Sequence, residues 1–162
     1  MKLLFIVAAI ALSSSLFAQS ATTLDKVYIG KSHLIHLVGS SGKDTTMPKE
    51  KGQVDVSAPK LSTDKQTAGW LIHEDNCCTS YSIPTRLLIF RADKKLRLGD
   101  GLMIYDWCFV DGSARVAVST GTVHGMVDRH LLLYDASSGQ QLQEWNGKDD
   151  EAPPPWAKDL EA

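Results

Sequence analysis

Two adjacent cysteines lie in a short polar stretch, HEDNCCTSYSIP, at residues 73–84. Thiolate and imidazole groups are common ligands of transition metals. The candidate ligands are Cys77, Cys78, His73 and His124. Adjacent side chains diverge in an extended chain, and no C-x-x-C or H-x-x-x-H spacing sets two donors side by side. We therefore expect neither a metal nor another cofactor, and a metal-binding or redox protein that uses Cys77, Cys78 and His124 is the alternative hypothesis.

Catalysis by the same stretch would need an activated nucleophile or a pair of proton-transfer groups. A Cys/His pair needs a reduced thiolate of low pKa. A serine hydrolase needs a nucleophile elbow such as G-x-S-x-G, which this sequence lacks. A hydrolase that uses Asp75, Asp128 and His124 as acid and base is a third hypothesis, which residue types alone support. We expect a protein without catalytic activity.

The first 20 residues have the features of an export signal. Lys2 supplies the positive start, residues 3–12 form an apolar run, and small residues follow. The run is too short to span a membrane. Cleavage before Gln19 or Ala21 is expected, and no cysteine stands there for lipid attachment. The sequence predicts a soluble extracytoplasmic protein, either periplasmic or secreted.

Export also bears on the cysteines, because thiols oxidise outside the cytoplasm. Three cysteines allow one disulfide and leave one thiol free. The preferred pair is Cys77 with Cys78, a strained ring that would fix the shape of a surface loop. Pairing either of them with Cys108 is the alternative. Cys108 lies in the strand-like segment IYDWCFV, where alternation places Trp107 on the opposite face as a core anchor.

The charge of the chain is nearly balanced. Its 17 basic and 19 acidic residues give a formal net charge of −2, and the lysines do not cluster. Nucleic-acid binding therefore has no electrostatic support. The partner is expected to be a protein or a small-molecule ligand.

Hydrophobic residues alternate with a period of two along most of the chain, as in RLLIFR, RVAVST and HLLLYD. Segments with Asp, Gly or Ser separate these runs, as in STDKQT, VDGSA and DASSGQ, and such residues favour turns. The pattern predicts a mainly β protein built from hairpins. Only PPPWAKDLEA at the end has the composition of a turn or two of helix.

Two parts of the chain have a similar order of elements. Residues 61–72 align with 108–119, and residues 86–92 align with 130–136. The predicted organisation is a signal peptide (1–20), N-terminal strands with a polar loop (21–52), two repeats (about 53–103 and 104–147) and an acidic, proline-rich tail with a short helix (148–162).

The two units resemble blades of bacterial β-propeller repeats of the WD40 and TolB-like kind. An Asp turn precedes the second strand of each unit, and LLLYDASSGQQLQEW is similar to the third and fourth strands of such blades. The chain also resembles, more loosely, small secreted bacterial proteins with a Cys-Cys-Thr-Ser-Tyr loop, which imply no activity. The expected fold is two blade-like antiparallel sheets packed together, with a β-sandwich as the alternative.

Two blades are too few to close a ring, so one sheet face needs a cover. We expect the N-terminal strands to supply it, and open sheet edges would otherwise allow self-association. The apolar residues expected to face the sheet are Val27, Ile29, Leu34 and Val38.

The aligned units also predict where a site would lie. The cysteine stretch joins the second and third strands of the first unit, and residues 120–129 join the same strands of the second, so both loops should emerge on one face. The leading hypothesis is a non-catalytic binding or interaction module that uses this face, with His73 and His130 nearby. The candidate binding residues are Asp75, Asn76, Cys77, Cys78, Tyr81, His124 and Asp128.

Overall fold

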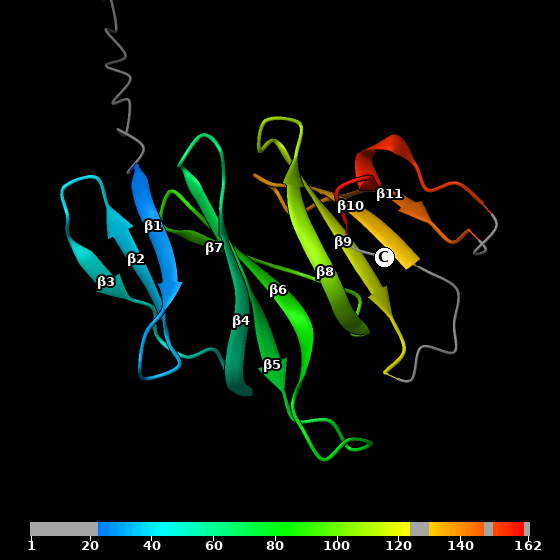
Figure 1. Cartoon of the computed structure of the whole chain (residues 1–162), viewed down its shortest axis with the longest axis horizontal. Helices are drawn as coiled ribbons and strands as arrows, with labels where there is room; N and C mark the ends of the chain where they lie inside the picture. Colours follow the sequence, from blue (N-terminus) through cyan, green and yellow to red (C-terminus); the bar gives the residue numbers. More distant parts are fainter. Residues whose placement is uncertain (1–22, 124–129, 148–150, 161–162) are drawn as a thin grey trace, which may run out of the picture.

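The computed structural model describes residues 23–123, 130–147 and 151–160. These residues form three antiparallel sheets and one short helix (Figure 1). The mainly β fold predicted from the alternating pattern is therefore confirmed. No helix among the described residues is long and apolar enough to cross a membrane. The predicted signal peptide lies outside the described residues.

The first four-stranded sheet is a meander in which each strand pairs with the next. Its central strands have apolar runs because both of their faces are buried. Ala92 and Asp93 form the last turn, and both have the positive φ that a type I′ hairpin turn requires. The strands are β4 (Gln53–Leu61), β5 (Thr67–Glu74), β6 (Ile83–Arg91) and β7 (Lys94–Leu98).

The second four-stranded sheet is also a meander. As in the first sheet, its successive strands are joined by a short turn, a long loop and a second short turn. This order agrees with the prediction of two similar antiparallel sheets. It fits both the blade-like and the sandwich hypothesis, and the resemblance to propeller repeats stays an expectation. The strands are β8 (Met103–Val110), β9 (Arg115–Gly121), β10 (His130–Asp135) and β11 (Gln141–Trp145).

The main hydrophobic core lies between these two sheets. Alternation along β5 and β6 directs Leu71, Leu87 and Ile89 toward the second sheet, where they pack with Val116, Trp107 and their neighbours. Trp107 is fully buried, and Phe109 meets its ring edge-on at a centroid distance of 5.2 Å. The predicted inward face of β8 is therefore correct.

A smaller N-terminal sheet covers the other face of the first sheet (Figure 1). The cover was predicted, but most of the residues named for it were wrong. Leu24, Ile35 and Leu37 point inward, whereas Ile29 is 36% exposed. Val27 packs against this cluster as predicted, because a register irregularity between Leu24 and Lys26 puts it on the same face as Leu24. In β2 the buried positions are the alternate ones to those predicted. The strands are β1 (Leu24–Ile29), β2 (Ile35–Gly39) and β3 (Asp44–Thr46).

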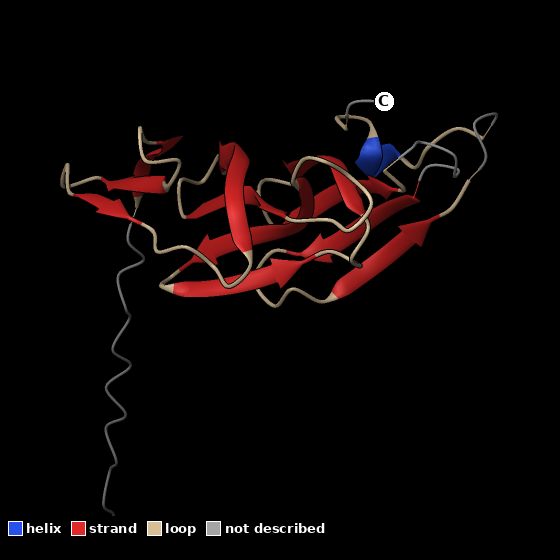
Figure 2. Ribbon diagram, turned by 90° about the horizontal axis from the view of Figure 1, so that it is seen from below, coloured by secondary structure: helices blue, strands red, loops and turns tan. Residues whose placement is uncertain are grey.

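The C-terminal tail covers the outer face of the second sheet. Its only helical part among the described residues is the single 3₁₀ turn η1 (Pro155–Ala157), within the turn or two of helix expected (Figure 2). Ala157 and Leu160 pack with Ala117, Leu131 and Leu133, so β9 and β10 are buried on both faces. The layers are therefore the N-terminal sheet, two four-stranded sheets and the tail.

The two four-stranded sheets have two distinct ends. The turns at residues 62–66 and 111–114 meet at one end, where the Thr63 amide donates to the Ser113 hydroxyl oxygen over 3.1 Å. We call this the turn end. We call the opposite end the loop end. It carries residues 75–82, which join β5 to β6, and the connection between β9 and β10. Residues 75–82 extend beyond the strands there (Figure 1).

Candidate functional site

The loop at residues 75–82 contains a tight turn with the two cysteines at its centre. The Asn76 side-chain oxygen accepts a hydrogen bond of 2.8 Å from the Cys78 amide, and the Asn76 carbonyl accepts one of 3.5 Å from the Thr79 amide. Neither cysteine has a positive φ, which fits a type I turn with asparagine at its first position.

This turn brings the two thiols together. The Sγ atoms of Cys77 and Cys78 lie 2.9 Å apart, and both residues are exposed. The expectation that adjacent side chains diverge is therefore wrong here, because it assumed an extended chain. The two sulfur atoms are free thiols in this structure, and the vicinal disulfide stays a prediction. The hydrogen bond with Cys77 raises the pKa of the Cys78 thiol.

Cys108 is separated from this pair by its position in the fold. Its side chain packs on the tail side of the second sheet, away from the first sheet. Burial raises the pKa of its thiol to about 11, so Cys108 is a poor nucleophile at neutral pH. A disulfide from the loop to Cys108 would require large backbone movement, because bridged Cα atoms lie within about 7 Å of each other.

Tyr81 is the most exposed large hydrophobic side chain of the described residues, at 61%. Its carbonyl accepts a hydrogen bond of 2.6 Å from the Thr79 hydroxyl, which ties it to the cysteine turn. Asp75 is also exposed, at the start of the loop. The loop is therefore held by its own polar contacts, while its aromatic ring points away from the core.

The two described histidines predicted near the cysteines, His73 and His130, have other polar partners. The Nε2 atom of His73 lies 2.6 Å from the Ser57 hydroxyl, across the strand pair β4 and β5. His124 and Asp128 lie outside the described residues. Among the residues described, no group of three or more His, Cys, Asp or Glu side chains is arranged to hold a metal ion.

His130 belongs to a separate polar cluster that sequence reasoning did not identify. Its Nδ1 atom lies 3.1 Å from Asp100 and 3.2 Å from the Thr120 hydroxyl, and its Nε2 atom lies 3.1 Å from Glu144. Asn146, His130 and Gln141 lower the pKa of Glu144. The imidazole thus joins the β7–β8 connection to the edge strand β11.

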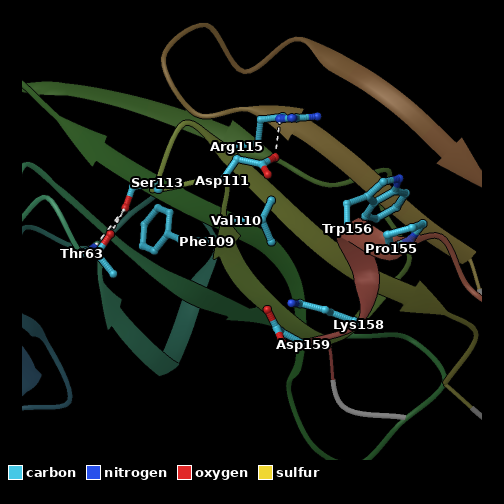
Figure 3. Close-up of a pocket in the computed structure, with 11 residues that line it drawn as sticks. Thr63, Phe109, Val110, Asp111, Ser113, Arg115, Pro155, Trp156, Lys158 and Asp159 are labelled. Carbon is cyan, nitrogen blue, oxygen red and sulfur yellow. Dashed lines mark hydrogen bonds and ion pairs between the residues drawn. The ribbon is translucent and has the colours of Figure 1, made fainter.

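The turn end holds a pocket of about 540 Å³ between the β8–β9 turn and η1 (Figure 3). Figure 3 shows Trp156 and Pro155 on one side, facing Thr63 and Ser113 across Val110. The lining residues are Thr63, Phe109, Val110, Asp111, Gly112, Ser113, Arg115, Pro155, Trp156, Lys158 and Asp159.

The polar groups of this pocket largely satisfy one another. Arg115 contacts Asp111 at 2.6 Å, and the Thr63 and Ser113 hydroxyls are 3.0 Å apart. The Trp156 indole donates to Gln143 over 2.7 Å and its ring packs on the second sheet, so Trp156 docks the tail. With two cations balanced by two carboxylates, the pocket gives no preference for a charged ligand.

Sequence reasoning missed this pocket because it depends on where the tail docks. The Asp-Gly turn at residues 111–112 and the sequence PPPW at 153–156 were visible, but nothing local places one beside the other. No protein-family model matches this chain. No curated protein is significantly similar to it either, so its function must be inferred from the geometry of the described residues.

Proposed function

We propose that this protein is an extracytoplasmic, non-catalytic binding module whose loop end contacts a protein or a small-molecule ligand. The observation that supports this proposal best is the distribution of exposed apolar side chains. Of six exposed large hydrophobic residues in the described chain, four belong to the loop end. These four are Val54, Tyr81, Leu102 and Tyr105.

The strand pairing places these residues at one end. Val54 is the second residue of β4, whose first residue pairs with Glu74 beside the cysteine loop. Leu102 and Tyr105 flank the start of β8, where Met103 pairs with the last residue of β9. The four side chains therefore come from three separate segments that end on the same side of the two sheets.

Four exposed apolar side chains at one end of the two sheets favour a binding surface there, because exposed apolar patches commonly mark interaction sites. Tyrosine is among the residues that contribute most to binding energy in interfaces. A loop already braced by hydrogen bonds also loses less conformational entropy on binding than a free one. Tyr81, on the braced cysteine turn, is the residue from which we expect the largest contribution.

The remaining surfaces favour the loop end as well. The N-terminal sheet covers the outer face of the first four-stranded sheet, and the tail covers the outer face of the second. Among the described residues, these two covers limit the access of a ligand to the outer sheet faces, and the pocket at the turn end lies between the tail and the second sheet. In this proposal the Cys77–Cys78 doublet shapes the loop, and its oxidised form is the vicinal disulfide that the sequence predicts.

The proposal can be tested by affinity capture with a matched pair of variants. The full protein, its Tyr81→Ala variant and its Leu142→Ala variant are each immobilised and exposed to an extracytoplasmic extract of the native cell. Leu142 is a suitable control because it is 43% exposed but lies on β11 near the turn end. Bound proteins and small molecules are identified by mass spectrometry.

The expected result is a species retained by the wild type and by Leu142→Ala, with recovery reduced at least tenfold for Tyr81→Ala. A buried tyrosine at the centre of an interface contributes about 2 kcal/mol or more, which corresponds to that loss. Equal recovery with all three proteins would contradict the assignment of the loop end.

A further inference from the structure

The two cysteines of the turn are exposed and already face each other as free thiols. Their sulfur atoms lie 2.9 Å apart, while an S–S bond is about 2.05 Å long, so closing the ring needs a movement of about 1 Å. Both residues are exposed, and neither packs in any of the three hydrophobic clusters. The pair is therefore accessible to reagents in solution.

A disulfide at this position would add little to global stability. Cross-linking stabilises a fold mainly by closing a long loop in the unfolded chain, and adjacent residues close the shortest loop that exists. Exposed and strained disulfides are also the ones that are readily reduced and serve regulatory roles. These two facts favour a reversible bond over a permanent staple.

We propose that Cys77 and Cys78 form a reversible thiol–disulfide switch that sets the shape of the loop at residues 75–82 and thereby the presentation of Tyr81. The regulatory meaning of this switch rests on the proposed binding function of the loop end. The chemical switch itself is a property of the turn.

The reaction needs a disulfide as oxidant, either a small molecule such as glutathione disulfide or a thiol–disulfide oxidoreductase. The thiolate of one cysteine attacks a sulfur of the donor disulfide and releases one thiol, which leaves a mixed disulfide. The thiolate of the second cysteine then attacks the cysteine sulfur of that mixed bond and releases the second donor thiol. Both cysteines are oxidised, each gives up one proton, and the donor disulfide is reduced to two thiols.

The contacts of the loop connect the switch to Tyr81. The Asn76 side chain holds the Cys78 amide, the Asn76 carbonyl holds the Thr79 amide, and the Thr79 hydroxyl holds the Tyr81 carbonyl. Ring closure restrains the peptide bond between the two cysteines, because that peptide becomes part of the closed ring, and it carries the Cys78 amide. The change therefore reaches the tyrosine through these three hydrogen bonds.

The switch can be measured on the purified wild-type protein. It is equilibrated in buffers of graded reduced and oxidised glutathione, starting once from the reduced and once from the oxidised protein, then quenched with acid, alkylated and digested with trypsin. Both cysteines fall in the peptide of residues 66–86, while Cys108 falls in the peptide of residues 98–115. The two sites are therefore read separately without a mutation.

We expect the 66–86 peptide to appear two hydrogens lighter as the oxidised fraction of glutathione rises, with the same curve from both starting points. Cys108 should stay a thiol throughout. A peptide that remains reduced at every ratio, or that remains oxidised at every ratio, would overturn the switch. Thiols that resist alkylation until a chelator is added would also overturn it and favour a metal site.

The loop shape is tested by hydrogen exchange of the same two forms. The amides of residues 76–82 should exchange at different rates in the dithiol and the disulfide, while β5 and β9 should be unchanged. The Cys78→Ser variant has one thiol in the loop and should give a single exchange pattern in both buffers. Equal exchange rates in the two wild-type forms would overturn the link to Tyr81. None of these measurements uses the ligand, so failure of the switch and failure of the binding function are observed separately.

Discussion

Replacing Trp107 with alanine tests the packing of the two four-stranded sheets. The ring is fully buried between them, and its indole N–H donates to the Ala58 carbonyl over 3.1 Å. An aromatic side chain buries about 200 Å², which corresponds to about 5 kcal/mol at about 25 cal/mol per Å². The remaining alanine and local collapse reduce the loss, so we expect Trp107→Ala to lower the free energy of unfolding by about 3–5 kcal/mol.

The assay is urea denaturation monitored by circular dichroism. With a slope of about 1–3 kcal/mol per M, the midpoint should fall by about 2 M, or the variant should be unfolded without urea. Trp156→Ala is the matched control, because this ring is only partly buried and docks the tail. A midpoint for Trp107→Ala equal to that of the wild type would show that the inward face of β8 is assigned wrongly.

Three further predictions concern other parts of the chain. Gly69→Ala should destabilise by about 1–3 kcal/mol, since an added Cβ would lie 2.6 Å from the Trp107 ring; a denaturation midpoint at or above the wild type would contradict this. Lys95 and Arg97 lower the pKa of Glu50, so the stability that ionised Glu50 adds to the fold is present above its unfolded-state pKa and is lost as pH falls through its folded-state pKa. Glu50→Gln should therefore reduce the loss of stability toward low pH, measured by thermal melts from pH 7 to 3. A pH profile identical to that of the wild type would refute this. The mature protein from its native cell should begin at Gln19 or Ala21 by N-terminal sequencing, which an intact initiator methionine would contradict.

Much of the strand arrangement could be predicted from the sequence. Period-two alternation predicts both that a segment is a strand and which residues lie on each of its faces. Trp107 and Cys108 were therefore correctly assigned to opposite faces of β8. The same rule was applied to the wrong face of β2, where Ile35 and Leu37 are buried instead of Leu34 and Val38, and in β1 a register irregularity places Leu24 and Val27 on one face. Periodicity carries no information about such irregularities, because they depend on the pairing partner.

Only part of the candidate site could be predicted from the sequence. The polarity of residues 73–84 predicts an exposed loop, and Tyr81 is indeed exposed. The approach of the two sulfur atoms was missed, although asparagine before the cysteine pair is a known signal for a turn. His73 and His130 have partners on neighbouring strands, and such long-range contacts cannot be read from local spacing.

The loop end is the central claim, and site-specific photocrosslinking in the native cell tests it most directly. A photoreactive p-benzoylphenylalanine replaces Tyr81 in one strain and Leu142 in another, and the cells are irradiated before the protein is isolated. We expect a discrete adduct from position 81, identified by mass spectrometry, that is missing from position 142. An adduct of equal yield from both positions, or from position 142 alone, would contradict a binding surface at the loop end.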